Sequence, residues 1–386
     1  MNILLYDIGS YIQKDLIYFL KKHGYSCRNI IYKQNEITLY DDIFFEKKFN
    51  EQLDRSAFDF VMSTNFSPIV AKLCCQRNIK YIAWTYDSPI NTDHIEYYQF
   101  PTSYIFLFDR HEVERVKALG GQNIFHMPLA VNPERIGKTI ITEEDSAFYS
   151  TDISFVGNFY EGILPQLLAP QSEYDRGYID AVAASQLHVF GYNFIDEMIS
   201  EDLIARMNQC LKDQNYFVTG LTKRGLSHNI ATSVTHTERL VLLSMLGRSH
   251  NIRYYSSTKP EVLSHLAYGG IVSYFTQMPK IFRLSRLNLC PTLKSIRSGI
   301  PLRALDILCC GGALLSNYQP ELAEYFIDGK DVIMYESIED ALAKADYYLK
   351  HEDKRLQIVR NGYQKVTTHF TYPDRISSIL KTAGVI

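Results

Sequence analysis

Residues Asn288–Gln319 read NLCPTLKSIRSGIPLRALDILCCGGALLSNYQ. In this stretch an apolar run is followed by a loop that contains Gly299 and Pro301. Because proline fits the first position of a helix, we expect a helix from Leu302 onward. The glycine pair Gly311–Gly312 then ends the helix before a second apolar run. The stretch therefore predicts a strand, a loop, a helix and a second strand, which together form a repeating unit of an α/β sheet.

Basic residues surround the start of this predicted helix. We expect an anion such as a diphosphate to bind here. The free backbone amides of the helix start would bind it together with Lys294, Arg297 and Arg303. Asp306 lies one turn beyond Arg303, so both side chains point the same way. Its carboxylate can accept hydrogen bonds from a ribose diol. The alternative is an ordinary Arg303–Asp306 ion pair on the surface of the helix, without a ligand.

The rest of the chain alternates short apolar strands with amphipathic helices. Strands are expected at 2–6, 27–32, 58–63, 81–85, 104–108, 124–127, 153–158, 252–255, 271–274, 287–290, 313–316 and 332–335. Helices are expected at 68–76 and 112–119, through most of 179–247, and from 338 onward. Strands separated by helices favour parallel sheets that are covered on both faces.

A chain of 386 residues is too long for one ordinary core, so we predict two domains. The fold class is α/β, with two Rossmann-like domains that face a central cleft. A polar stretch at 133–152 separates two similar halves, and we place the domains at 1–148 and 149–370. Residues 371–386 are expected to form a C-terminal helix that packs back on the first domain.

Composition and motifs exclude several classes of function. The net charge of −3 comes without a lysine- or arginine-rich block, so no nucleic-acid partner is expected. The opening apolar run is too short for a signal peptide or a membrane span, which favours a cytoplasmic protein without integral membrane contact. The sequence contains no GxGxxG, Walker A or HExxH motif and no Cys/His ligand set, so no metal site is predicted. The seven cysteines are expected to be reduced thiols.

Polar residues follow nearly every predicted strand of the first half. In an open α/β sheet the carboxyl ends of the strands share one edge, and ligands bind there. We therefore expect a functional rim made of the segments after these strands. Their residues include Asp7, Gly9, Asn65, Tyr86, Asp87, Ser88, Asp109 and His111.

Several short segments, taken in order, resemble one known family. They are YIAWTYDSP at 81–89, FDR at 108–110, PLAVN at 128–132, SFVGN at 154–158, TER at 237–239, QMP at 277–279, the stretch 299–319 and YYLKHE at 347–352. The C-terminal half resembles the bacterial group-1-type glycosyltransferases related to the spore maturation protein CgeB. The N-terminal half resembles the domain of unknown function, DUF3880, that often precedes them. The resemblance implies a GT-B fold and metal-independent transfer of a sugar from a nucleotide sugar, with a UDP-sugar as the expected donor and no permanently bound cofactor.

The resemblance implies that the second domain holds the donor. The segment Gln277–Pro279 would lie against the base, Asp306 on the ribose, and the loop Lys294–Arg303 around the diphosphate and sugar. The full donor-binding set comprises Gly157, Asn158, Gln277, Met278, Pro279, Thr292, Lys294, Ser295, Arg297, Gly299, Ile300, Arg303 and Asp306. Many retaining enzymes of this kind carry a glutamate eight positions before the ribose-binding acid. Here Ser298 stands at that position, so the anomeric outcome stays open.

An inverting transferase needs a general base near the acceptor hydroxyl. Asp87 is the first candidate, with Asp7, Asp109 and His111 behind it. The acceptor, a glycan or a protein hydroxyl, is expected to contact Gly9, Asn65, Trp84, Tyr86, Ser88 and Asp109. In a retaining enzyme Asp87 would only position the acceptor, and in the plainest alternative it is the turn former of an Asp-Ser-Pro segment.

Two further functions compete with an active transferase. The serine at position 298 favours a catalytically silent protein that binds nucleotide sugars or acts as a scaffold. An epimerase of the same fold would need a carboxylate–histidine set that we do not find in the sequence.

Overall fold

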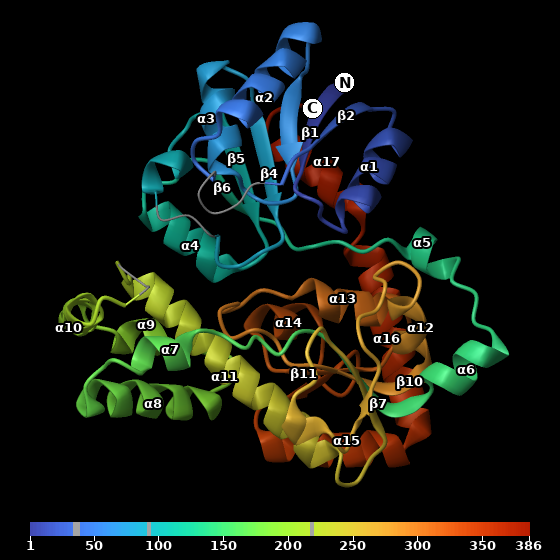
Figure 1. The fold of residues 1–386 in the computed structure, drawn as a ribbon. Helices are drawn as coiled ribbons and strands as arrows, with labels where there is room; N and C mark the ends of the chain where they lie inside the picture. The colour runs from blue at the N-terminus through green and yellow to red at the C-terminus, as the bar shows by residue number, and fades with distance from the viewer. Residues whose placement is uncertain (34–38, 91–93, 217–219) are drawn as a thin grey trace. The chain divides into compact units, whose positions relative to one another are not determined.

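The computed structural model describes residues 1–33, 39–90, 94–216 and 220–386. The chain divides into two compact units, Met1–Pro133 with Val366–Ile386, and Glu134–Lys365. Each unit is built on one six-stranded parallel sheet (Figure 1). The α/β class that the sequence predicts is therefore confirmed, and each sheet is considered below on its own.

The first unit has the strand order β2-β1-β3-β4-β5-β6. The strands are β1 (Asn2–Asp7), β2 (Ser26–Ile31), β3 (Phe60–Ser63), β4 (Tyr81–Thr85), β5 (Ser103–Leu107) and β6 (Ile124–His126). Every residue of β3 and β4 is buried, as expected for central strands covered by helices on both faces. The strand order reverses between β1 and β3, which makes the loops after these two strands the topological switch point.

Helices cover this first sheet, and the last helix of the chain is one of them. They are α1 (Gln13–Lys22), α2 (Ile43–Arg55), α3 (Pro68–Gln76), η1 (Ile95–Tyr98), α4 (Arg110–Ala118) and α17 (Tyr372–Thr382). The ring of Tyr372 stacks on Phe19 of α1 with 5.3 Å between the ring centroids. In Figure 1 the red helix α17 accordingly lies with the blue α1. The first unit thus combines both ends of the sequence.

The second unit has the strand order β12-β11-β10-β7-β8-β9. The strands are β7 (Thr151–Val156), β8 (Ile252–Tyr255), β9 (Ala267–Tyr268), β10 (Ser285–Cys290), β11 (Leu314–Asn317) and β12 (Ile333–Tyr335). Here the order reverses between β7 and β10. A buried hydrogen bond of 2.8 Å from Ser154 Oγ to Asn288 Oδ1 joins these two strands.

The helices of the second unit fall into two groups. The first group forms its own apolar cluster: α7 (Leu164–Leu168), α8 (Glu173–Leu187), α9 (Ile195–Met198), α10 (Glu201–Asp213) and α11 (Lys223–Leu246). The others are α5 (Pro133–Gly137), α6 (Glu143–Tyr149), η2 (Glu261–Leu263), α12 (Met278–Leu284), α13 (Leu302–Cys309), α14 (Pro320–Tyr325), α15 (Ile338–Lys350) and α16 (Glu352–His369). The helix predicted from Leu302 is α13. Part of the predicted helical region 179–247, residues 217–219, lies outside the described residues.

The strand predicted at 271–274 is wrong. The edge strand is instead β9, which ends at Tyr268, before the predicted strand would begin. It pairs with β8. Gly270 has a φ of +72°, a left-handed conformation in which the chain leaves the sheet. Ile271 beyond it is 79% exposed. An apolar run is therefore a poor guide to a strand when a glycine pair stands before it.

The boundary between the units also differs from the predicted one. It lies at Pro133–Glu134 rather than at 148–149, and residues 366–370 belong to the first unit. Contacts with α12 hold the intervening segment in the second unit. Lys280 forms an ion pair with Asp145 at 2.7 Å, and Arg283 donates to the carbonyls of Ile136 and Thr139 at 3.3 and 3.1 Å.

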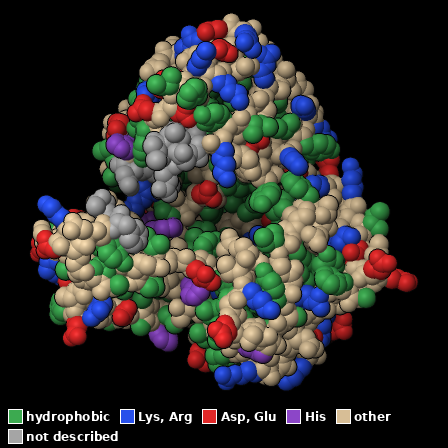
Figure 2. All heavy atoms as spheres, in the orientation of Figure 1, with side chains coloured by type: hydrophobic (Ala, Val, Ile, Leu, Met, Phe, Trp, Pro, Cys, Tyr) green, Lys and Arg blue, Asp and Glu red, His purple; other side chains and the backbone are tan. Residues whose placement is uncertain are grey.

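The surface carries both signs of charge. On the face drawn in Figure 2, lysine and arginine side chains are interspersed with aspartate and glutamate side chains. This mixture agrees with the small formal net charge of −3. Among the described residues visible there, neither sign covers a broad area.

We predict that Gly312→Ala destabilises the second unit by about 1–3 kcal/mol, because it overpacks a rigid site. A Cβ atom at Gly312 would lie 2.7 Å from the Phe282 carbonyl oxygen and 2.6 Å from Asn288 Nδ2. Gly137→Ala is the control, since nothing lies within 4 Å of a Cβ atom there. Urea unfolding of both variants tests this, and equal stability of the two would contradict it.

Candidate functional site

Arg239 of α11 joins the two loops at the switch point of the second sheet. Its guanidinium donates to the carbonyl of Asn158 after β7, and to that of Pro291 after β10 at 2.6 Å. It also lies over the ring of Tyr160, 4.8 Å from the centroid. The side chain is 7% exposed, and its Nε has no hydrogen-bond partner among the described residues. A buried guanidinium with an unused N–H group at a switch point is suited to binding an anion.

The neighbouring residue Glu238 forms a buried ion pair. Its Oε2 lies 3.0 Å from Lys294 Nζ, and its Oε1 accepts a hydrogen bond of 3.0 Å from the hydroxyl of Tyr335. Burial, together with the adjacent carboxylate, raises the pKa of Tyr335 well above its ordinary value, so this hydroxyl stays protonated and donates. Lys294 also lies over the Phe190 ring at 4.2 Å. Lys294 was predicted to face a diphosphate, and the structure shows its charge already balanced by Glu238.

Side chains from neighbouring segments hold the loop after β10. The backbone amide of Thr292 donates to Asn317 Oδ1 at 2.7 Å. Arg297 pairs with Asp196. Ser298 donates from Oγ to Oε1 of the buried Glu321 at 2.8 Å. The loop is therefore preorganised by contacts with β11, α9 and α14.

Asp306 of α13 is buried rather than on the surface. Its Oδ1 accepts a hydrogen bond of 3.0 Å from the Tyr274 hydroxyl. Arg303 is half-buried and its guanidinium contacts the sulfur of Met278. The predicted alternative, a surface ion pair between Arg303 and Asp306, is therefore wrong, because α13 turns its Asp306 face into the protein.

The remaining residues of the predicted donor-binding set are distributed around this loop. Gln277 donates from Nε2 to the Tyr149 hydroxyl at 3.2 Å and accepts from the Ser273 amide at 2.8 Å. Gly157 donates its amide to the Tyr255 carbonyl at 3.0 Å. Asn158 is exposed and Ser295 is half-buried, whereas Met278, Pro279, Gly299 and Ile300 are buried. Ile300 belongs to the apolar core, which leaves only its backbone for a contact with a ligand.

In the first unit, Asn65 and Asp87 form a polar pair at the ends of β3 and β4. Asn65 Nδ2 donates to Asp87 Oδ2 at 2.6 Å, and Asn65 Oδ1 accepts from the amides of Tyr86 and Asp87 at 2.8 and 3.2 Å. Asp87 is reachable from solvent, yet desolvation by surrounding atoms raises its pKa, and the hydrogen bond from Asn65 opposes this rise. A carboxylate with a raised pKa on a strand end is a candidate general base.

The other acids of this rim stabilise their own turns. Asp7 accepts hydrogen bonds from the amides of Gly9 and Ser10 at 2.7 and 3.3 Å and from Asn29 Nδ2 at 3.2 Å. These contacts occupy the Asp7 carboxylate and disfavour it as a base. Gly9 itself has a φ of +88°, which the turn requires.

Asp109 caps the first turn of α4. It accepts from the His111 amide at 3.1 Å, and its second oxygen accepts from the Ser88 hydroxyl at 3.1 Å. Asp109 is buried, whereas His111 and Ser88 are half-buried at the rim. Capping the helix is a sufficient reason for an aspartate at position 109, so its presence does not require contact with a sugar acceptor.

Trp84 does not reach the rim, so the acceptor contact predicted for it is wrong. The side chain is fully buried in the core of the first unit, where its ring packs against Tyr86 and Tyr372 with centroid distances of 5.1 and 5.7 Å. Residues alternate between the faces of a strand, and Trp84 points toward α17 rather than toward the strand end.

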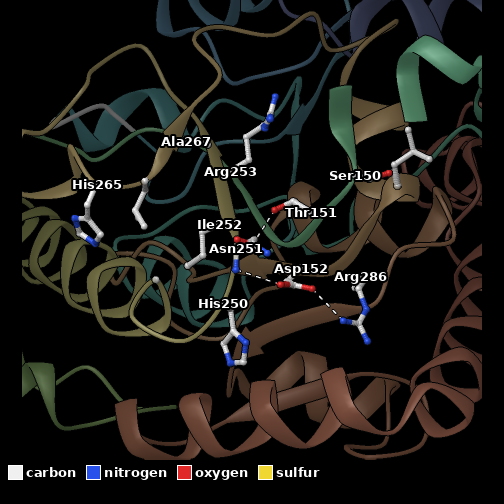
Figure 3. Close-up of a pocket in the computed structure, with 13 residues that line it drawn as sticks. Ser150, Thr151, Asp152, His250, Asn251, Ile252, Arg253, His265, Ala267 and Arg286 are labelled. Atoms are coloured by element: carbon white, nitrogen blue, oxygen red, sulfur yellow. Dashed lines mark hydrogen bonds and ion pairs between the residues drawn. The ribbon is translucent and has the colours of Figure 1, made fainter. Parts of the chain in front are cut away.

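A pocket of about 740 Å³ lies at the opposite edge of the second sheet, around the amino ends of β7, β8 and β10 (Figure 3). Its central Asp152 is held between Arg286 Nη1 at 3.0 Å and the Asn251 amide at 3.2 Å. His250 pairs with Asp346 at 2.6 Å. Because the pocket lies at the amino ends of these strands, it does not belong to the switch-point site at their carboxyl ends.

The described residues contain neither a membrane-spanning helix nor a cluster of metal-binding side chains. No helix there is long and apolar enough to cross a bilayer. No group of three or more His, Cys, Asp or Glu side chains there is arranged to hold a metal ion. Cys290, at the end of β10, is buried, which raises the pKa of its thiol to about 11 and keeps it protonated.

Solved structures of low sequence identity share this architecture over the whole chain. HepE from Anabaena, in complex with UDP and glucose, has a TM-score of 0.55 at 9% identity, with 100% of both chains covered. Sucrose-phosphate synthase from Thermosynechococcus elongatus has a TM-score of 0.58 at 8% identity and covers 99% of this chain and 98% of its own. The BGT of T4 phage, in complex with its UDP-glucose substrate, has a TM-score of 0.53 at 9% identity, with 99% of both chains covered. The fold is GT-B.

A family described as glycosyl transferase-like matches residues 239–381. The match begins at Arg239 and includes the loop after β10 and helix α13. No curated protein matches the chain in sequence.

Sequence reasoning omitted Arg239, Glu238 and Glu321 from the candidate set. Arg239 and Glu238 lie within the TER segment at 237–239 that supported the resemblance, so a signal was present. It had no assigned role because both side chains come from the middle of α11, far from the loop in sequence. Glu321 gave no comparable signal.

We predict that Lys294→Met destabilises the protein by about 3–5 kcal/mol, because it leaves the buried Glu238 carboxylate without its counter-charge. The double variant Glu238→Gln/Lys294→Met should recover most of this loss. Lys280→Met, which breaks the more exposed pair with Asp145, is the control and should cost about 1 kcal/mol or less. Denaturant unfolding measures all three, and an equal loss for the single and double variants would disprove the assignment.

Proposed function

We propose that this chain is a glycosyltransferase that moves a sugar from a nucleotide-sugar donor, a UDP-sugar, to a glycan or protein acceptor. The observation that carries the proposal is Arg239, a buried guanidinium with an unused N–H group at the switch point of the second sheet. The glycosyl transferase-like match over residues 239–381 and the UDP complexes of GT-B neighbours support it. Within this proposal the chain is CgeB-like, with a DUF3880-like first half.

The second unit would bind the donor through three groups. Arg239 and the backbone amides at the start of α13 would face the diphosphate. Asp306 would accept hydrogen bonds from the ribose after exchanging its present partner, the Tyr274 hydroxyl. Positive groups fixed in place can balance the charge of the departing nucleoside diphosphate, so the proposed reaction needs no metal.

The first unit would bind the acceptor, with Asp87 as the general base in an inverting reaction or as a positioning group in a retaining one. Asn65 orients Asp87 through the hydrogen bond of 2.6 Å. The second candidate function, a catalytically silent nucleotide-sugar-binding protein, is favoured by Ser298, which lacks a carboxylate of its own. Glu321 Oε1 lies 2.8 Å from the Ser298 hydroxyl, but this carboxylate is buried and holds the loop, so both candidate functions go forward to the test.

A donor screen tests the proposed function. The chain is incubated with UDP-, GDP-, dTDP- and CDP-sugars, binding is followed by thermal shift, and released nucleotide is detected by mass spectrometry. A transferase should bind a UDP-sugar and release UDP. Binding without release in the presence of varied acceptors would favour the silent protein, and binding of no donor would refute both.

We predict that Arg239→Gln weakens UDP binding about 10–100-fold, as expected for the loss of one or two charge-assisted hydrogen bonds to phosphate. Arg253→Gln is the matched control, because Arg253 lines the pocket at the other edge of the same sheet and stacks on Phe148. Isothermal calorimetry measures both, with thermal unfolding to verify that each variant is folded. Equal affinity of a folded Arg239→Gln variant and the wild type would remove Arg239 from the donor site.

We predict that Asn65→Ala moves the acidic limb of the pH–rate profile to higher pH. A general base is active when deprotonated, so activity is lost as the pH falls through the Asp87 pKa. Removing the hydrogen bond that lowers this already raised pKa therefore shifts the loss upward. Asp87→Asn should abolish turnover. If Asn29→Ala, which removes the hydrogen bond to Asp7, moves the limb instead, Asp7 is the base.

A further inference from the structure

Tyr160 has a backbone conformation that a bulky side chain disfavours. It lies in the loop after β7, at the switch point of the second sheet, and its φ is +56°. Among the described residues, the other non-glycine residues with a positive φ are Asn78 and Asn215, and asparagine tolerates this region. A tyrosine in the left-handed region costs free energy, and such strain is found mainly at functional sites.

Contacts of the neighbouring residues fix this loop. Phe159 is 1% exposed, and its ring packs on that of Tyr254 with 5.9 Å between the centroids. The Phe159 carbonyl lies 3.0 Å from Nδ1 of His236 on α11. Asn158 Oδ1 accepts a hydrogen bond of 3.2 Å from the Ser257 hydroxyl. The strained residue is therefore held in its conformation by the packing of the loop.

The strained conformation brings the ring of Tyr160 onto Arg239. The central carbon of the guanidinium lies 4.8 Å from the centroid of this ring and 5.4 Å from that of Phe155. A ring binds a guanidinium through its face, whereas the N–H groups lie at its edge. Two edge groups donate to the carbonyls of Asn158 and Pro291, and Nε has no partner among the described residues. The ring thus fixes the guanidinium without using its remaining donor.

Core packing explains one of these two rings but not the other. Phe155 is 2% exposed and belongs to the apolar core, whereas Tyr160 is 37% exposed. A partly exposed aromatic residue with a strained backbone adds little to a core. Its contact with a buried charge at the switch point is the feature that accounts for it.

We propose that Tyr160 is a positioning residue of the donor site, and that its ring holds the Arg239 guanidinium in place for the diphosphate. This inference rests on the donor site proposed above. A cation that is already oriented and shielded from water attracts an anion more strongly than one that must first be reoriented. The backbone strain at Tyr160 is the cost of placing a ring there.

Pyrophosphate is the probe for this inference, because it presents a diphosphate without a nucleoside or a sugar. Tyr160→Asn removes the ring and introduces a residue that tolerates the left-handed region. In isothermal calorimetry this variant should bind pyrophosphate and UDP about three- to tenfold more weakly than the wild type, as expected for the loss of a cation–π contact. Tyr160→Phe keeps the ring and should bind both like the wild type.

Urea unfolding distinguishes positioning from a structural role. Tyr160→Asn should unfold at the same urea concentration as the wild type or at a higher one, because the backbone strain is relieved. A residue that only supports the fold would lower the unfolding midpoint and leave the affinities unchanged. Tyr174→Asn is the matched control, since Tyr174 on α8 is 75% exposed in the same unit, and it should leave both affinities unchanged.

Equal affinities of Tyr160→Asn and the wild type would overturn the inference. Tighter binding by this variant would also do so, because the ring would then cover Arg239 rather than position it. Weakened pyrophosphate binding by the variant, in a protein that binds no nucleotide, would keep the role of Tyr160 and reject the proposed function. UDP binding that Tyr160→Asn leaves unchanged would do the reverse, and a wild type that binds neither ligand would reject both.

Discussion

The second unit depends on two adjacent side chains of one helix. α11 delivers Glu238 and Arg239 to the carboxyl edge of the sheet, where they contact segments that are distant in sequence. Glu238 joins Lys294 after β10 to Tyr335 at the end of β12, and Arg239 joins the loops after β7 and β10. Three segments of the candidate site thus share one support. A change in the position of α11 would move all of them together.

This arrangement costs stability that an apolar core would not. Burying an ion pair carries a desolvation penalty that its attraction seldom exceeds, and a buried guanidinium with an unused N–H group adds to it. Natural sequences depart from the most stable packing mainly where function requires it. The charged cluster lies at the switch point, where α/β proteins bind ligands, while in the pocket at the opposite edge Asp152 is paired with Arg286. The energetic cost of the buried charges and the strand order therefore both indicate the carboxyl edge of the second sheet as the ligand-binding edge.

The regular parts of the fold were predictable because they depend on local patterns. Apolar runs bounded by glycine and proline located the strands of the first sheet and the helix after Pro301, since periodicity and turn chemistry act within a few residues. The prediction that required the direction of a side chain failed at Trp84, which lies inside the core beside a polar segment. Glu238 and Arg239 were missed because contacts across the chain leave no local pattern.

Ser298 illustrates the same limit and bears on the choice between an active and a silent protein. A search for a glutamate at a fixed spacing from Asp306 finds serine and suggests a missing acid. The structure places the carboxylate of Glu321 at 2.8 Å from that serine hydroxyl, from a position 23 residues further along the chain. Chemistry depends on where a charge lies in space rather than on which residue number carries it. Glu321 is 1% exposed and bonds Ser298 through both its carboxylate and its backbone amide, so what it holds in place is the loop itself.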